Sequence, residues 1–298
     1  MASNIRVGVS RLPYTGSWEG PELSHGPEIM ERGLVELTSK GEIEVVEASE
    51  ARLTSEEEGE YGAWHRLGLA SRRLGDIIAA QRRRGLFPIA LLSNCSGLMG
   101  VLGGLQRSGR RPLRVGLVYC DAHADYNTPE TTLSGMLGGM PVAASTGLCL
   151  SRLRMECGLD PALPSRYVVM VGVRDVDPLE RELLDRSEVT HISVEEVREA
   201  SLSIDLEVER LERLTDVVYV HVDLDVLDPA EVGGHRFPVE GGPSSLELSE
   251  ALAMIFEHKN VGAFGVASYP TGGGSEPLEA VKNLLRGVFE GLGRRPRL

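Results

Sequence analysis

The 298-residue sequence lacks the features of several large protein classes. It has no apolar run near the roughly 18 residues that span a bilayer, so we expect no membrane association. It has no excess of basic residues: the formal net charge is −13, which argues against a nucleic-acid-binding surface. Its four cysteines form no CxxC motif or regular framework, which predicts a reducing, cytoplasmic location.

Two short acidic runs stand out in the sequence. Asp121, His123 and Asp125 follow the apolar run 113–120, and Asp223 and Asp225 follow the apolar run 217–222. Such apolar runs are typical of buried strands in a parallel sheet. Carboxylates at i and i+2 point the same way, because side chains alternate between the two faces of a strand. Buried together, these side chains would repel each other unless a cation lay among them.

The donor types in the two runs favour one kind of metal. Hard carboxylate oxygens with one imidazole suit a divalent ion such as Mn²⁺ better than a thiolate-preferring metal. A single run would be equally consistent with carboxylates that cap the next helix or turn. Two runs, one of them with a histidine, favour the metal site.

Strand-like and helix-like segments alternate along the chain. Strands are expected at 5–9, 43–46, 87–92, 114–119, 167–173, 189–192, 217–222 and 261–266, and helices at 28–37, 63–83, 194–200, 246–258 and 277–292. Repeated βα units predict an α/β protein with three α/β/α layers around a central, mainly parallel sheet. No linker-like stretch divides the chain, so we expect a single domain over residues 1–298. Ligands bind beyond the carboxyl ends of such strands, where both acidic runs lie.

Three motifs resemble those of the arginase branch of the ureohydrolases. They begin at Asp121 (Asp-Ala-His-Ala-Asp-Tyr-Asn), at Val171 (Val-Gly-Val-Arg-Asp-Val-Asp-Pro) and at His221 (His-Val-Asp-Leu-Asp-Val-Leu-Asp-Pro). Order and spacing agree with the family from about residue 26 to about residue 270. The resemblance implies an arginase-like α/β/α fold, a trimer or hexamer, and a small amino-acid-like substrate. It also implies a pair of Mn²⁺ ions whose bridging hydroxide hydrolyses a carbon–nitrogen bond.

The resemblance assigns a role to each member of the two acidic runs. Asp121 and Asp223 would bridge both ions, and His123 with Asp225 would complete the second metal site. Asp125 would complete the first metal site and is counted among the catalytic residues.

Cys95 stands where the family has the remaining histidine ligand of the first metal. A thiolate is softer than manganese prefers, so ligation by Cys95 would weaken or re-specify that site. The alternative is that Cys95 is a small buried residue and that only one ion binds well. A cysteine also occurs here in a family member that cleaves N-hydroxyarginine. His221, on the same strand face as Asp223, is expected to pack or hydrogen-bond behind the ligands.

Three further departures from the family lie where a guanidinium would bind. Gly138 replaces a proton-shuttle histidine, Phe237 replaces a threonine, and Ala267 stands where a carboxylate is expected. A guanidinium without acceptors for its five donors is costly in a closed site. Glu240 or His235 could replace the missing carboxylate or shuttle, unless both are solvated loop residues.

Residues that hold the amino-acid head in arginases are intact, namely Asn127, Thr132, Ser134 and Asp177. The resemblance therefore implies a manganese-dependent hydrolase of an arginine-like or otherwise modified α-amino acid, such as an N-hydroxyarginine-type substrate. One alternative is a degenerate family member that serves as a structural or regulatory subunit, and another is a deacetylase or amidase of related architecture. The surviving metal-binding positions favour the enzyme, because buried carboxylates without a metal destabilise a fold.

Overall fold

A computed structural model of the chain describes residues 5–16, 21–38, 43–270 and 274–295. Within these ranges, eight strands form one sheet in the order β2-β1-β3-β8-β7-β4-β5-β6, and all neighbours are parallel. The strands are β1 (Ile5–Leu12), β2 (Ile43–Glu50), β3 (Phe87–Leu92), β4 (Val115–Cys120), β5 (Val168–Val171), β6 (Thr190–Ile192), β7 (Val217–Asp223) and β8 (Val261–Ala267). Each predicted strand is present, and the parallel sheet is confirmed.

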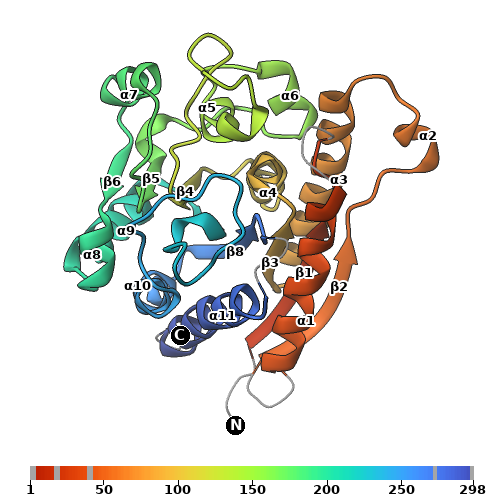
Figure 1. Ribbon diagram of the computed structural model, residues 1–298. Coiled ribbons are helices and arrows are strands. Elements are labelled where there is room, and N and C mark those ends of the chain that lie inside the picture. Colours follow the sequence, from red (N-terminus) through yellow and green to blue (C-terminus); the bar gives the residue numbers. More distant parts are fainter. Residues whose placement is uncertain (1–4, 17–20, 39–42, 271–273, 296–298) are drawn as a thin grey trace.

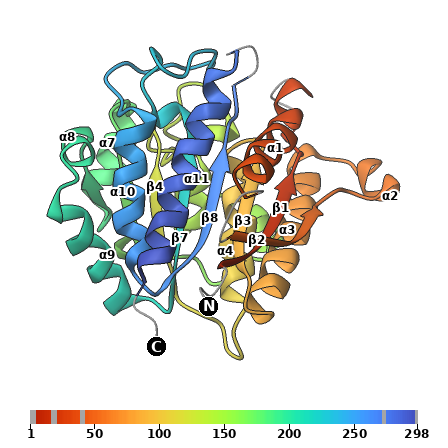
Figure 2. The same ribbon diagram turned by 90° about the horizontal axis from the view of Figure 1, so that it is seen from below.

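Helices cover both faces of this sheet. One face carries α1 (Gly26–Thr38), α8 (Val194–Arg198), α9 (Leu202–Leu214), α10 (Ser245–Glu257) and α11 (Glu276–Arg294); Figure 2 shows α1, α10 and α11 on the near side of the strands. The other face carries α3 (Ala63–Arg83), α4 (Leu98–Gln106), α5 (Pro141–Ser145), α6 (Ser151–Glu156) and α7 (Pro178–Asp185). The three-layer α/β/α prediction is therefore confirmed.

Short elements complete the described chain. Helix α2 (Ser55–Glu58) lies away from the sheet (Figure 1). Single turns of 3₁₀ helix occur at η1 (Pro21–His25), η2 (Cys95–Gly97), η3 (Leu137–Gly139), η4 (Ser165–Tyr167) and η5 (Leu224–Val226). None of the described helices is long and apolar enough to cross a membrane. The single domain over residues 1–298 stays a prediction.

Alternation along the strands divides the apolar core into two halves. On β3, Ile89 and Leu91 pack with the α1, α10 and α11 layer, whereas Ala90 and Leu92 pack with the α3 and α4 layer. Strands β4 and β7 are buried along their whole length, as the apolar runs predict for inner strands of a parallel sheet. The central strands are thereby held between two apolar layers.

Helix α4 was not predicted, because its sequence is apolar all round and rich in glycine. Such a helix has no polar face, and all of its residues are buried. A Cβ at Gly100 would overlap the backbone carbonyl of Ser71, and one at Gly104 would overlap the backbone of Gly75. Helices α3 and α4 therefore meet backbone to backbone. This contact positions the start of α4, which directly follows Cys95 in η2.

Replacing Gly100 by alanine tests this contact. We expect Gly100→Ala to lower the free energy of unfolding by about 1–3 kcal/mol, because the two helix backbones must separate. The matched control is Gly293→Ala in α11, where an added Cβ meets no described atom within 4 Å. That change should be neutral or slightly stabilising. Urea denaturation measures both, and equal effects of the two variants would refute the close contact.

Candidate active site

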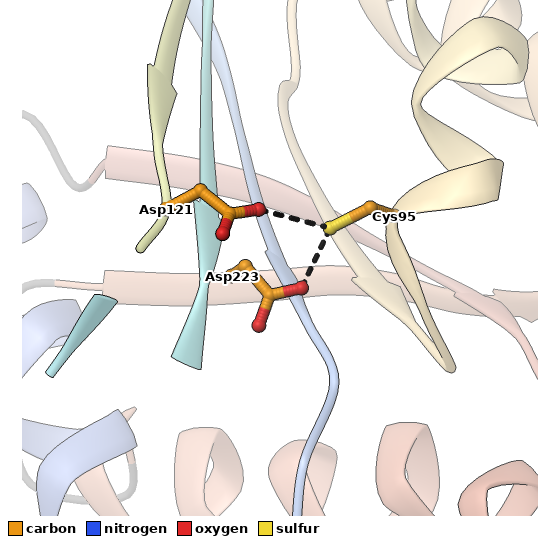
Figure 3. A group of neighbouring side chains, drawn as sticks. All are labelled: Cys95, Asp121 and Asp223. Atoms are coloured by element: carbon orange, nitrogen blue, oxygen red, sulfur yellow. Dashed lines mark hydrogen bonds between the residues drawn. The ribbon is translucent and has the colours of Figure 1, made fainter. Parts of the chain in front are cut away.

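Four neighbouring strands at the centre of the sheet, β3, β8, β7 and β4, end at one place. Asp223 is the last residue of β7, Asp121 directly follows β4, and Cys95 begins the turn after β3. All three side chains are buried and converge (Figure 3). The Cys95 Sγ lies 2.7 Å from Asp223 Oδ2 and 3.8 Å from Asp121 Oδ2. The ligand atoms of this first group lie within 4.8 Å of one another.

A second group shares Asp121 with the first. Asp121, His123 and Asp225 also offer ligand atoms within 4.8 Å of one another. The His123 Nδ1 is 3.4 Å from Asp121 Oδ1 and 3.2 Å from Asp225 Oδ2. Backbone amides orient the carboxylates: His123 N donates to Asp121 Oδ1, and Asp225 N donates to Asp223 Oδ1. The structure thus joins the two acidic runs that lie about a hundred residues apart in sequence.

Two hydroxyl groups that the sequence analysis did not single out contact these carboxylates. The Tyr119 hydroxyl lies 2.7 Å from Asp121 Oδ2 and 2.5 Å from Asp125 Oδ2, and Ser268 donates to Asp223 Oδ2 at 2.5 Å. Tyr119 could have been found by alternation, since it lies two residues before Asp121. Ser268 follows β8 and has no comparable signal in the sequence.

Burial and mutual repulsion disfavour the charged form of the carboxylates. Burial and then the charge of Asp225 raise the pKa of Asp223 to about 7, and burial and then Asp121 raise the pKa of Asp225 to about 6. Burial alone would lower the pKa of His123, but its hydrogen bonds to Asp121 and Asp225 raise it to about 12. Burial and Asp121 also raise the pKa of Asp125. Clustered carboxylates with an imidazole and a sulfur fit divalent cations, which would relieve this repulsion.

Cys95 is buried among negative charges. Burial, and then the charges of Asp223 and Asp121, raise the pKa of the Cys95 thiol well above its ordinary value. Behind the sulfur lies His221, with Nε2 at 3.2 Å from Sγ and Nδ1 at 2.9 Å from the Tyr219 hydroxyl. Burial lowers the pKa of His221 to about 3, so the ring is neutral. This agrees with the expected hydrogen bond behind the ligands.

A cavity of about 520 Å³ opens onto both groups. Its lining includes the predicted metal ligands Cys95, Asp121, His123, Asp125, Asp223 and Asp225, and the predicted substrate residues Asn127, Ser134 and Asp177. Thr132 is absent from this lining; its Oγ1 accepts a hydrogen bond from Gly135 N.

The structure separates the two candidate replacement groups. His235 lines the cavity, and its Nε2 is buried with no hydrogen-bond partner among the described residues. Glu240 does not line the cavity and is exposed, so its predicted catalytic role is not supported. Asp228 accepts from Gly241 N, and Arg174 donates to the Glu240 carbonyl, which holds this loop with the Glu240 side chain in solvent.

One buried carboxylate of the cavity was not predicted. Glu180 is 3% exposed, lines the cavity, and accepts from Tyr126 N at 2.7 Å and Asp177 N at 3.1 Å. Asn127 Nδ2 donates to Asp177 Oδ2 at 3.0 Å beside it. In the sequence, Glu180 fits the N3 position of a helix capping box whose N-cap is Asp177, so its place in the cavity could not be recognised.

Comparison with known proteins agrees with the motifs. A model of the arginase family matches residues 6–270. An arginase of Bacillus caldovelox is 30% identical over 255 residues, which cover 85% of this chain and 81% of that one. An arginase of Brevibacillus brevis is 32% identical over 188 residues, 62% of each chain. The solved structure of the Bacillus caldovelox arginase matches with a TM-score of 0.83 at 24% identity, over 95% of this chain and 98% of that one.

The carboxylate cluster predicts an unusual pH dependence of the metal-free protein. A carboxyl whose pKa rises from 3.8 to about 7 on folding, as for Asp223, binds more protons folded than unfolded between these values. Its contribution to the free energy of unfolding therefore falls as pH rises through that window. His123 acts in the same direction. Because its pKa is raised from 6.5 to about 12, its contribution to the free energy of unfolding is complete below about pH 6.5 and is lost as the pH rises toward 12.

This effect is measured by comparing the free energy of unfolding of chelator-treated wild type with that of chelator-treated Asp223→Asn as a function of pH. Comparing the two cancels other carboxyls, such as Glu57, whose lowered pKa acts in the opposite direction. We expect Asp223→Asn to be more stable than wild type at about pH 8 and to lose this advantage at about pH 4. Parallel stability curves for the two proteins across this range would contradict the prediction.

Proposed function

This chain belongs to the arginase family, and we propose that it is a hydrolase with two Mn²⁺ ions that acts on a modified α-amino acid. Family membership confirms the predicted class, hydrolases acting on non-peptide carbon–nitrogen bonds. The observation that carries the finer proposal is the convergence of two ligand groups on one cavity. The expected trimer or hexamer and the cytoplasmic location stay predictions.

The two ligand groups divide between the two ions. The first group, Cys95, Asp121 and Asp223, would hold the first ion together with Asp125, and the second group, Asp121, His123 and Asp225, would hold the second ion together with Asp223. When bound, the ions would lower the pKa of a water molecule enough to make it nucleophilic at neutral pH. The protein keeps the donors in place through Tyr119, Ser268 and the backbone amides of the two runs.

The polar end of the cavity suits an amino-acid head group. Asp177 and Glu180 offer carboxylate oxygens to an α-ammonium, and Asn127 and Ser134 offer polar groups to an α-carboxylate. The Asn127 amide is held by Asp177, so it is oriented before a ligand arrives. Charge-assisted hydrogen bonds of this kind fix both the position and the direction of a small substrate.

At the positions where the family binds a guanidinium, this chain has residues of a different chemical kind. Gly138 and Phe237 line the cavity, and Ala267 is fully buried and adds no acceptor. A full guanidinium would leave donors without partners here. For a less basic tail, such as an N-hydroxyguanidine, donors left without acceptors cost less binding free energy. Burial lowers the pKa of His235, which favours its unprotonated form. We assign it to proton transfer: it would accept a proton released at the nucleophile and pass it to the departing nitrogen.

Metal analysis separates an enzyme from a structural subunit. We expect Asp223→Ala to lose metal, because Asp223 would serve both ions, and Cys95→His to keep or strengthen binding. Bound manganese is measured after dialysis into a manganese buffer. The control is Asp185→Ala, an exposed carboxylate outside the cavity. Less than about half an equivalent on the wild-type protein would favour the subunit instead.

A substrate panel tests the altered tail pocket. Manganese-loaded protein is incubated with arginine, N-hydroxyarginine, agmatine, guanidinobutyrate and several acyl-amino acids. We expect poor turnover of arginine, because its guanidinium finds no carboxylate partner, and better turnover of a substrate with a less basic tail and an intact α-amino acid head. Arginine hydrolysis with a kcat of roughly 10 s⁻¹ or more would refute this assignment.

A further inference from the structure

Cys95 has an imidazole directly behind it, on the side away from the cavity. His221 is fully buried, does not line the cavity, and places Nε2 at 3.2 Å from Cys95 Sγ. Its Nδ1 lies 2.9 Å from the Tyr219 hydroxyl. The three side chains form a line, Tyr219–His221–Cys95, which ends at the first ligand group.

Residues of both neighbouring strands pack against this line of side chains. Tyr219, His221 and Asp223 alternate onto one face of β7, and Tyr119 lies opposite His221 on β4 with its ring stacked on the imidazole at 5.2 Å. On the other side, Gly265 of β8 lies opposite His221. A Cβ at Gly265 would overlap the Tyr219 hydroxyl, so the glycine leaves room for it. The orientation of the ring is therefore determined from both neighbouring strands.

Hydrogen-bond accounting assigns the donors along this line. A neutral imidazole has one N–H and one acceptor nitrogen. If the Tyr219 hydroxyl donates to Nδ1, the remaining N–H is on Nε2 and points at the Cys95 sulfur. A hydrogen bond to a cysteine sulfur fixes its direction and withdraws electron density, as the surroundings of metal-bound sulfur do elsewhere. A sulfur held in this direction is positioned to bind an ion together with Asp121 and Asp223.

We propose that His221, oriented by Tyr219, is a positioning residue that adapts Cys95 as a ligand of the first metal. It donates Nε2–H to the sulfur and holds it toward Asp121 and Asp223. The inference rests on the proposed metal pair. It assigns to this chain a compensation for the histidine that Cys95 replaces: the imidazole acts through the sulfur instead of binding the ion itself.

Cobalt is the spectroscopic probe, because a cysteine bound to Co²⁺ gives a sulfur-to-metal charge-transfer band. Wild type should show this band, and Cys95→Ala should lose it. His221→Phe should shift or weaken the band and raise the Kd for Mn²⁺ about 10- to 100-fold, the usual effect of losing a partner of a metal ligand. His221→Gln, which keeps an N–H donor, should restore much of both signals.

Tyr219→Phe gives a second test that removes only a hydroxyl. It should shift the band in the same direction as His221→Phe, by a smaller amount. The matched control is Tyr167→Phe, at a buried tyrosine that ends η4 directly before β5, and it should change neither signal. If His221→Phe does not fold, the Tyr219→Phe band decides.

The outcomes distinguish this inference from the proposed function. A wild-type protein that binds neither Co²⁺ nor Mn²⁺ contradicts the proposed function itself. A wild type with the band, together with an unchanged band and unchanged Kd in His221→Phe or Tyr219→Phe, overturns the role of His221 alone. A band in wild type that survives in Cys95→Ala overturns ligation by Cys95.

Discussion

The arrangement of the site depends on one interaction, the mutual repulsion among carboxylates at the ends of the central strands. Asp121 and Asp223 are buried and lie close to the partly buried Asp225, so that each charge raises the cost of the next. Their partners within the chain, backbone amides with hydroxyl and thiol donors, orient the oxygens but supply little positive charge. His123 is the cation that the cluster itself provides. A site of this composition fits divalent cations, which would relieve the repulsion among its carboxylates.

Close backbone contacts and positive φ values help to position the side chains of the site. The backbone contact between α3 and α4 positions the turn that carries Cys95, and Gly265 leaves room for the Tyr219 hydroxyl behind it. Asp125 and Ser268 adopt positive φ values of 50° and 61°, a conformation that is costly for residues other than glycine. Both contact the carboxylate cluster or its hydroxyl partner Tyr119. Two of the four non-glycine residues with positive φ in the described chain therefore lie where these side chains converge.

The two ends of the cavity differ in chemistry. The head end has oriented polar groups, Asn127 and Asp177 with the buried Glu180, in a network that exists before a ligand binds. The tail end presents Phe237 and Gly138, together with the His235 Nε2, which has no hydrogen-bond partner in the part of the chain that the structure describes. Under the proposed function, this cavity would select by the amino-acid head and discriminate by the basicity of the tail, because an unmatched charged donor costs more than an unmatched neutral one.

Sequence pattern alone determined the strands, the parallel sheet and both acidic runs, because apolar runs and the i, i+2 spacing are local properties of a chain. It also placed His221 behind the ligands by alternation. It could not locate α4, whose apolar sequence has no helical period, nor distinguish His235 from Glu240, since both belong to one loop. Only the tertiary structure decided that Ser268 and Glu180 join the site. Their neighbours come from distant strands, and the order of those strands is set by packing of the whole sheet.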